Sequence, residues 1–523
     1  MLISINRYEF DLSWTKVLYF FVAIAFVLYS FKDLNYNTAF VDEAIYATVG
    51  EEVLRGIYWE DAISWMGGSY IYPVISALIN RRFGLEGIRL FSTFCVLITG
   101  IVAGKIGRKL GGKKVELITL FLFLFSSVSL NLAQLATYDA PSLLFTALSL
   151  YTALLSQNSH RYREIVLVLF SAILISVAIL TKYVAILFLP IIGILILIKG
   201  RKFEIGLAFL WTLIVVAILA LFLSFYLDDV LSYFAGRNSQ EPADLAKIVK
   251  ELGSDAALSL TGSLLGLIFA LKDKKQSFGK ILTYPKKFSS AFFPLEQKLQ
   301  SIIEKADQRK FLVILLTLGG LSPLTYHLAF LNIRSFWKHM VYASFFWAPV
   351  SGWVFYKLYK SVQNTQKNTT LISNLAQLIL TLSLVAVITN LWINFSKHWR
   401  FQRSWPSASR AIAFLERNRK PEDRIFAEAS AIYKYHLFSG FEDPYSWSST
   451  WYLEYKGKDG VEAMKLAIRD RTFSYIILNN YFTQSIDEEL LTDIKNYYYL
   501  TMEDSYKVSG QYDNLTTIWA PKF

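Results

Sequence analysis

An adjacent pair of carboxylates, Asp42 and Glu43, follows the first long apolar run of the sequence. An acidic side chain at the boundary of a membrane is costly unless it is solvated or used in a function. The pair therefore marks the first place where we expect chemistry. Asp42 is the residue that we expect to act as a general base, taking a proton from an attacking hydroxyl.

Other charged and aromatic residues stand at the ends of later apolar runs. Lysine and arginine are the usual neutralising partners of phosphate. Carboxylates and cations that converge on one face predict a site that binds an anion and moves a proton. The sequence offers Asp139 as a second acid, Lys182, Arg334 and Lys338 as phosphate-binding cations, and Tyr46, Tyr138 and Tyr183 as contacts for a sugar or an acceptor.

A lipid phosphate suits this set of residues. A polyprenyl phosphate keeps its chain in the bilayer and its charge at the interface, where cations neutralise the charge that grows as the bond to the sugar breaks. Simpler interpretations exist: Asp42 and Asp139 as helix-start residues, Lys182 reaching the headgroups, and Arg334 and Lys338 as interfacial anchors. Asp42 and Asp139 could also hold a divalent cation or act without one.

A short helix is predicted to carry the first acid pair. Asp42 is the expected N-cap and Gly56 the expected C-terminal stop. Apolar residues recur at every fourth position, and we expect the opposite side, with Glu51 and Glu52, to be solvated. We therefore expect this helix to lie along the membrane surface, within an outer loop of residues 32–87.

The composition excludes both an ordinary soluble domain and a disordered chain. Of the 523 residues, 54% are hydrophobic and only 18% are charged. This indicates an integral membrane protein. Its net charge of +12 reflects basic loops rather than a nucleic-acid partner. The single cysteine, Cys95, excludes an intramolecular disulfide, and no cleavable signal peptide is evident.

Eleven apolar runs approach the length of about 20 residues that crosses a bilayer. The loop after the second run carries only basic charges, from Lys105 to Lys114, and so should be cytoplasmic. Basic and acidic loops then alternate, which places the N-terminus inside and the C-terminus outside. Residues 70–83 are interpreted as interfacial or partly inserted. The runs lie at about 14–31, 88–104, 115–131, 140–155, 165–180, 185–198, 205–226, 256–271, 311–328, 339–355 and 371–393.

The composition changes near residue 397, where we place the boundary between a transmembrane catalytic domain (1–396) and an extracytoplasmic α/β domain (397–523). Periodicity predicts helices at 407–416, 460–468 and 486–497 and strands at 424–427, 473–478 and 515–519. No glycine-rich phosphate motif occurs there, which favours an accessory role in acceptor binding.

The first 200 residues resemble the GT-C superfamily of membrane glycosyltransferases, in particular the protein O-mannosyltransferases and the aminoarabinose transferase that acts on lipid A. The resemblance covers the remaining spans loosely and the C-terminal domain hardly at all. It rests on Val41-Asp42-Glu43-Ala44-Ile45-Tyr46 with Leu54-Arg55-Gly56 after it, on Tyr138-Asp139-Ala140, and on Leu180-Thr181-Lys182-Tyr183 followed by Pro190.

The resemblance implies a polytopic GT-C-like fold of roughly 11 to 13 spans in the plasma (inner) membrane, with its site facing away from the cytoplasm. It implies an inverting transfer from a polyprenyl-phosphate sugar to a glycolipid, polysaccharide or protein, with Asp42 as the base and Asp139 as a second acid of the site. The aminoarabinose group has a Lys-Pro-Pro stretch where this chain has Gly68-Ser69-Tyr70-Ile71-Tyr72-Pro73. This departure argues against a lipid A substrate.

Two other functions stay open from the sequence. One is a polymerase or ligase of surface polysaccharide that uses a lipid-diphosphate donor. The other is a secondary transporter, which would bury ionisable residues at mid-span and break its helices in matched positions. The mid-span stretches here are nearly free of charge, which favours the enzyme.

Overall fold

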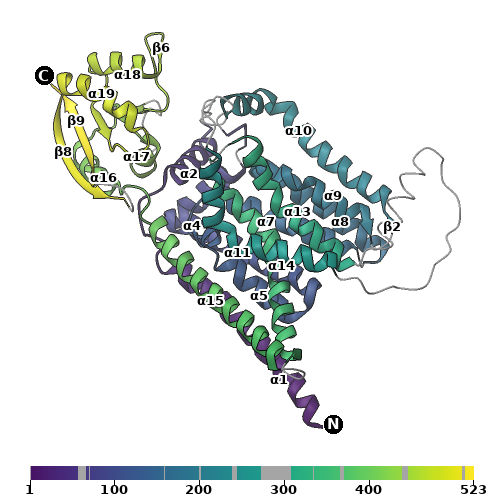
Figure 1. Cartoon of the computed structure of the whole chain (residues 1–523). Helices are drawn as coiled ribbons and strands as arrows, with labels where there is room; N and C mark the ends of the chain where they lie inside the picture. Colours follow the sequence, from purple (N-terminus) through teal and green to yellow (C-terminus); the bar gives the residue numbers. More distant parts are fainter. Residues whose placement is uncertain are drawn as a thin grey trace.

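The chain forms a helical domain up to Phe401 and a smaller α/β domain after it (Figure 1). The computed structural model describes residues 2–56, 66–69, 71–157, 159–199, 202–237, 244–272, 308–331, 333, 335–365, 370–438, 446–508 and 513–522.

The helical domain follows the expected order of apolar runs, each of which coincides with one helix or with two consecutive ones. The elements are α1 (Leu2–Phe31), α2 (Val41–Leu54), α4 (Ile71–Gly111), α5 (Lys113–Leu124), α6 (Ser127–Ala133), α7 (Asp139–Ser156), α8 (Arg161–Thr181), the 3₁₀ helix η1 (Tyr183–Phe188), α9 (Leu189–Leu197), the short strands β1 (Ile198–Lys199) and β2 (Lys202–Phe203), α10 (Ile205–Arg237), α11 (Leu245–Lys272), α13 (Gln308–Ala329), α14 (Phe336–Thr365) and α15 (Thr370–Phe401).

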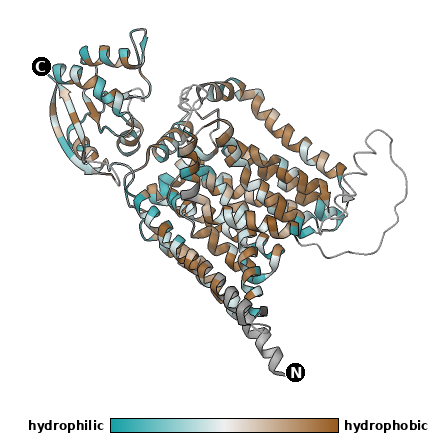
Figure 2. Ribbon diagram, viewed as in Figure 1, coloured by the Kyte–Doolittle hydropathy of each residue, from teal (hydrophilic) through white to brown (hydrophobic). Residues whose placement is uncertain are grey.

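Five of the described helices are long and apolar enough to cross a membrane: α1, α4, α8, α10 and α13. The number rises to seven if two bent pairs each count as one span, α5 with α6 at 66° and the two parts of α11 at 81°. Figure 2 shows that the strongly hydrophobic residues, in brown, are concentrated in the helices of this bundle. The count of roughly eleven spans stays a prediction.

Small polar side chains join the helices inside the bundle. The hydroxyl of Ser149 on α7 donates to the carbonyl of Ser171 on α8 at 2.8 Å. The hydroxyls of Ser263 on α11 and Thr317 on α13 lie 3.0 Å apart. Such residues let helices approach closely and satisfy each other's polar groups where lipid offers no partner. Helices α7 and α8, and α11 and α13, are therefore joined by polar contacts as well as by apolar packing.

Within the stretch expected from the sequence to be interfacial or partly inserted, residues 71–83 are helical and form the first part of α4. Gly84 interrupts this helix with a φ of 62°, a left-handed value that glycine adopts without steric cost. The break separates the first part of α4 from the part that starts at Leu85 and contains the second apolar run.

The N-cap of helix α2 lies two residues before the one expected from the sequence. Phe40 occupies the N-cap position and Asp42 lies in the first turn, so the prediction of Asp42 as N-cap is wrong. The physical reason is that Glu43 caps the helix instead: its Oε2 accepts the backbone N–H of Phe40 at 2.8 Å. The predicted stop is confirmed, since Gly56 follows the helix with a φ of 72°.

A five-stranded sheet in the order β4-β3-β7-β9-β8 forms the C-terminal domain. Strands β3 (Ile425–Ala427), β4 (Trp447–Ser449) and β7 (Tyr475–Leu478) are parallel, whereas β9 (Asp513–Pro521) runs antiparallel to β7 and to β8 (Tyr498–Lys507). Helices α16 (Ser409–Asn418) and α17 (Ser430–Leu437) pack on one face, and α18 (Gly460–Arg469) and α19 (Gln484–Tyr497) on the other. A separate hairpin pairs β5 (Glu454–Tyr455) with β6 (Lys458–Asp459).

All six elements predicted for this domain are present, as α16, β3, α18, β7, α19 and β9. The sequence did not indicate α17, β4 or β8. Helix α17 and strand β4 are too short for a clear period, and β8 lies at the edge of the sheet with mostly half-exposed or exposed side chains. Helix α15 continues past residue 397, so the change of structure follows Phe401.

The first loop of the helical domain packs into the α/β domain. Ala39, Val41 and Ala44 share a buried cluster with residues of α16, α17 and the sheet. A hydrogen bond from a side chain to the backbone reinforces this packing, because the indole N–H of Trp405 donates to the carbonyl of Thr38 at 3.2 Å. The start of α2 is thus fixed by both domains.

A buried ion pair also joins the two domains. Lys434 Nζ on α17 lies 2.6 Å from Glu52 Oε1 on α2, and the Glu52 side chain is 3% exposed. The expectation that Glu51 and Glu52 form a solvated face is therefore wrong for Glu52, because the α/β domain covers that side of the helix. Glu51 stays nearer the surface and pairs with Arg55 and Arg81.

The α/β domain buries a pair of carboxyl groups at the carboxyl ends of its parallel strands. Glu428, directly after β3, accepts the backbone N–H groups of Asn479, Tyr481 and Thr483 at 2.9, 2.9 and 2.5 Å. Burial, followed by the charge of Glu428 and a hydrogen bond to it, raises the pKa of Asp487 from 3.8 to about 8. The carboxyl group of Asp487 therefore binds its proton more tightly in the folded state than in the unfolded state. As a result, the stability of the domain falls as the pH rises from about 4 to about 8.

We expect the Asp487→Asn variant to lose most of this pH dependence, since asparagine resembles the protonated acid at every pH. The measurement is the unfolding temperature of the full chain in detergent between about pH 6 and about pH 9, where the wild type should become less stable. Glu488→Gln, which changes an exposed acid on the same helix, is the control. An unchanged pH dependence in Asp487→Asn would assign it to another group.

Candidate active site

Two acid–lysine pairs lie where the helical domain meets the first loop. Lys338 Nζ contacts Asp42 Oδ2 at 2.5 Å, and Lys182 Nζ forms an ion pair with Asp139 Oδ1. Lys338 also interacts electrostatically with Asp139, so the two pairs form one site. Four residues from four different segments, predicted separately from the sequence, are thereby brought together.

Asp42 is the most accessible of these four side chains. It is 25% exposed, whereas the Lys338 side chain is 8% exposed. Helix α2 presents Asp42 from its first turn, and the start of α14 presents Lys338. The carboxylate of Asp42 is therefore accessible from outside the bundle, while the Lys338 ammonium stays shielded from bulk water.

Asp139 is fully buried at the start of α7. The hydroxyl of Thr137 donates to its Oδ2 at 3.1 Å, and the positive end of the helix dipole favours its charge. Lys182 reaches it from the extended residue between α8 and η1. The break between these two helices, visible in the sequence as a polar interruption, gives Lys182 its direction.

Three tyrosines line the region of the two pairs. The ring of Tyr46 lies 4.7 Å from that of Tyr138 and 5.5 Å from that of Tyr72, between ring centroids. Tyr46 interacts electrostatically with both Asp42 and Asp139. The Lys182 amine lies 5.1 Å from the centre of the Tyr138 ring, within the range of a cation–π contact. Tyr46 and Tyr138 are thus brought to the site, and Tyr72 joins them although the sequence did not single it out.

Glu43 lies beside Asp42 in sequence but has a different environment. Its Oε1 and Oε2 accept hydrogen bonds from Arg89 Nε and Nη2 at 2.9 and 2.7 Å, and both side chains are completely buried. Its Oε1 also accepts the backbone N–H of Ala136 at 2.7 Å, and its Oε2 that of Phe40. Both oxygens of Glu43 are therefore used in holding protein groups.

Arg89 joins the first loop to α4. Besides Glu43 it donates to the carbonyls of Leu34 at 2.7 Å and Asn37 at 3.2 Å, and its guanidinium lies 4.3 Å from the centre of the Tyr36 ring. The sequence interpretation missed this residue. A signal was available, because an arginine inside an apolar run is costly unless it is paired.

Tyr183 follows Lys182 but contacts a different segment. Its hydroxyl donates to the carbonyl of Gly67, and its ring packs against Tyr233 and Phe234 of α10 at 5.5 and 5.7 Å between centroids. Gly67 has a φ of 64°, and a Cβ there would lie 2.6 Å from the tyrosine hydroxyl, so only glycine fits. Arg334 lies outside the described residues.

The described residues contain no group of three or more His, Cys, Asp or Glu side chains that could hold a metal ion. His327 Nε2 and His339 Nδ1 lie 2.9 Å apart, and both residues are buried. Each of the two site acids has a lysine as its nearest charged partner.

The family model described as dolichyl-phosphate-mannose-protein mannosyltransferase matches residues 66–226. This segment contains Arg89, Asp139 and Lys182 and ends before α14. A search among curated proteins finds no match.

Solved structures share the fold over nearly the whole chain. The chain is similar to ArnT from Cupriavidus metallidurans in the apo state, with 13% identity, a TM-score of 0.54 and coverage of 97% of this chain and 98% of that one. For ArnT from the same organism bound to undecaprenyl phosphate, the identity is 11% and the TM-score is 0.52, with coverage of 96% of this chain and 97% of that one. The chain is also similar to the oligosaccharyltransferase AglB from Archaeoglobus fulgidus in complex with an inhibitory peptide and a dolichol-phosphate. Here the identity is 9% and the TM-score is 0.53, with coverage of 98% of this chain and 75% of that one. The predicted resemblance to GT-C membrane glycosyltransferases is confirmed.

Proposed function

We propose that this chain, a GT-C-like membrane protein, transfers a sugar from a polyprenyl-phosphate carrier to an acceptor at the membrane surface. The observation that carries the proposal is the pairing of Asp42 with Lys338 and of Asp139 with Lys182 in one electrostatically connected site. The structures with lipid phosphates, ArnT with undecaprenyl phosphate and AglB with a dolichol-phosphate, support the same class of donor.

In the proposed reaction the lipid phosphate displaces Asp42 from Lys338. The Lys338 and Lys182 ammonium groups then neutralise the phosphate, whose charge grows as its bond to the anomeric carbon breaks. Asp42, released from its partner, accepts the proton of the acceptor hydroxyl that attacks the opposite face of that carbon. The acceptor oxygen forms a bond to the anomeric carbon as the bond to the phosphate oxygen breaks, so the transfer is inverting. The proton ends on Asp42, and the polyprenyl phosphate is the leaving group.

We assign Glu43 a positioning role in this reaction. Its oxygens hold Arg89 and two backbone N–H groups, so it fixes the first turn of α2 and with it the direction of Asp42. Asp139 in turn keeps Lys182 directed toward the site.

The proposed reaction takes place on the outer face of the plasma membrane. The support is the alternation of basic and acidic loops, which assigns the basic loop between α4 and α5 to the cytoplasm. Because α4 separates that loop from α2, the Asp42 site and the α/β domain then lie on the outside. Labelling of a cysteine introduced at Asn514 in intact cells tests this orientation.

The lysine that neutralises the donor phosphate can be tested by its effect on donor binding. We expect Lys182→Gln to raise the concentration of lipid donor needed for half-maximal rate by at least about tenfold, because a charged hydrogen bond to phosphate is lost. Lys182→Arg, which keeps the charge, should recover part of the affinity. An unchanged donor affinity in Lys182→Gln would remove Lys182 from the phosphate site.

The α/β domain supplies the acceptor surface in this proposal. Trp451 is 46% exposed and lies 5.9 Å from Phe482, between ring centroids. Phe482 in turn lies 6.5 Å from Phe40, which directly precedes α2. This row of rings leads from the exposed Trp451 toward Asp42, and in this proposal it binds the flat faces of an acceptor.

We expect Trp451→Ala to lower the transfer rate about 2- to 10-fold at limiting acceptor, the effect of losing one aromatic contact. The apparent affinity for the donor should not change. Tyr499→Ala, which removes an exposed ring from β8 at the far edge of the sheet, is the control. A loss of donor affinity equal to the loss of acceptor affinity would contradict the assignment.

Turnover of the donor tests the function as a whole. The purified chain in lipid is offered a panel of polyprenyl-phosphate sugars with an envelope extract, and both released polyprenyl phosphate and labelled product are followed. Release of carrier phosphate with formation of product supports the proposal. Consumption of lipid-diphosphate donors alone would favour the polymerase or ligase.

A further inference from the structure

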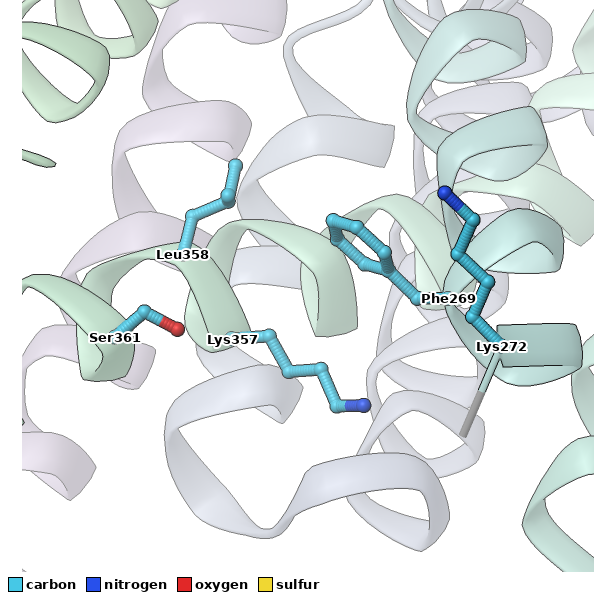
Figure 3. Close-up of a pocket in the computed structure, with 5 residues that line it drawn as sticks. All are labelled: Phe269, Lys272, Lys357, Leu358 and Ser361. Carbon is cyan, nitrogen blue, oxygen red and sulfur yellow. The ribbon is translucent and has the colours of Figure 1, made fainter. Parts of the chain in front are cut away.

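A cavity of about 290 Å³ lies between the last turn of α11 and the second half of α14. Figure 3 shows Lys357 extending from α14 toward the end of α11, which contributes Phe269 and Lys272. Leu358 and Ser361 complete the lining from α14. The described lining thus combines two cations, a hydroxyl and two apolar side chains.

The cavity is far from the site of the two acid–lysine pairs. Lys357 follows Lys338 on α14 by 19 residues. At 1.5 Å per residue of helix this separates the two lysines by about 28 Å, close to the thickness of a bilayer's hydrocarbon core. If Lys338 lies at one surface of the membrane, the cavity lies at the other, where it cannot take part in the transfer reaction.

The neighbouring surface of α11 is suited to lipid. Ile268 directly precedes Phe269, and Leu271 directly precedes Lys272. Their side chains are 44% and 65% exposed, and exposed apolar side chains are unfavourable in water but favourable against acyl chains. The Lys357 amine lies 4.3 Å from the centre of the Trp353 ring, in the preceding turn of α14. Trp353 itself is buried in the bundle, so the level of the cavity is indicated by its two lysines, since lysines near the ends of membrane helices commonly reach the headgroups.

We propose that this cavity binds the phosphate group of an anionic phospholipid. Lys272 and Lys357 neutralise the phosphate, and the Ser361 hydroxyl donates a hydrogen bond to it. Phe269 and Leu358 contact the first carbons of an acyl chain, a contact that a soluble phosphate compound would not make. Basic pockets between helices on the cytoplasmic side of membrane proteins are suited to such headgroups.

The test compares binding by the full chain in nanodiscs. The wild type and the Lys272→Gln/Lys357→Gln variant are placed in phosphatidylcholine alone or with added phosphatidylglycerol, and unfolding temperature and retained lipid by native mass spectrometry are measured. We expect phosphatidylglycerol to raise the unfolding temperature of the wild type and to stay bound to it. The double variant should lose at least half of both effects.

The matched control is Arg163→Gln/Lys360→Gln. It removes two exposed positive charges, one near the start of α8 and one near the end of α14, and it leaves the lining of the cavity unchanged. An equal loss in both double variants would overturn the proposal, because general attraction to an anionic surface would then explain the binding. Wild-type protein in phosphatidylcholine with added inorganic phosphate is a further arm. Equal stabilisation there would overturn the phospholipid as the source and leave a soluble phosphate compound.

This inference is independent of the proposed function. The Lys272→Gln/Lys357→Gln variant should still release carrier phosphate from a polyprenyl-phosphate sugar in a neutral bilayer. Failure of donor turnover in the wild type would refute the glycosyltransferase and leave the lipid measurement unaffected.

Discussion

Replacing Asp42 with Asn is expected to lower sugar transfer about 10²- to 10⁴-fold, the usual contribution of a general base. Asparagine has nearly the same shape and can still accept the hydrogen bond of Lys338, which lies 2.5 Å from the carboxylate, but it cannot accept a proton. Lys338 also interacts with Asp139, so its buried charge keeps one acidic partner. The variant should therefore fold.

The measurement is the rate of product formation at saturating donor and acceptor, together with the unfolding temperature. Glu51→Gln is the matched control, since Glu51 lies on the same helix but pairs with surface arginines. Normal transfer by a folded Asp42→Asn protein would remove Asp42 from the mechanism. A loss confined to donor affinity would assign Asp42 to substrate binding.

Replacing Glu43 with Gln is expected to lower the free energy of unfolding by about 3–5 kcal/mol, because Arg89 would be left as an unpaired buried charge. Both side chains are completely buried and joined by two hydrogen bonds. Activity should fall in proportion to the folded fraction and to any displacement of α2. This makes two adjacent acids, Asp42 and Glu43, separable by experiment, one through catalysis and the other through folding.

A double variant checks the assignment to the ion pair. Glu43→Gln combined with Arg89→Met should cost less than the sum of the two single changes, because neither charge is then left alone. Glu51→Gln, which breaks surface pairs, should cost no more than about 1 kcal/mol. A stable but inactive Glu43→Gln protein would instead indicate a direct catalytic part for Glu43.

The α/β domain helps to fix the position of the helix that carries Asp42. Glu52 and Lys434 form a buried pair between the domains, and Ala39 and Val41 are packed in the core of the second domain. The helix that presents Asp42 is thus held from both sides. A change in the α/β domain can therefore alter the position of Asp42 without touching it.

Sequence alone determined the features that depend on local pattern. Long apolar runs predicted the helices of the first domain, and alternation and amphipathic periods predicted six elements of the second, because these signals arise from neighbours within one or two turns. It also singled out Asp42, Asp139, Lys182 and Lys338 as candidate site residues, because charged groups at the ends of apolar runs are costly unless they are paired or used.

Tertiary structure decided the pairing of those charges and the environment of each. Which lysine meets which acid depends on how α2, α7, α8 and α14 pack, and no spacing in the chain encodes that distance. Glu43 and Glu52 resemble Asp42 and Glu51 in sequence, yet Arg89 and Lys434, both distant along the chain, bury them as ion pairs. Burial is a property of the assembled helices, so the difference between the accessible Asp42 and the buried acids Glu43 and Glu52 exists only after the chain has folded.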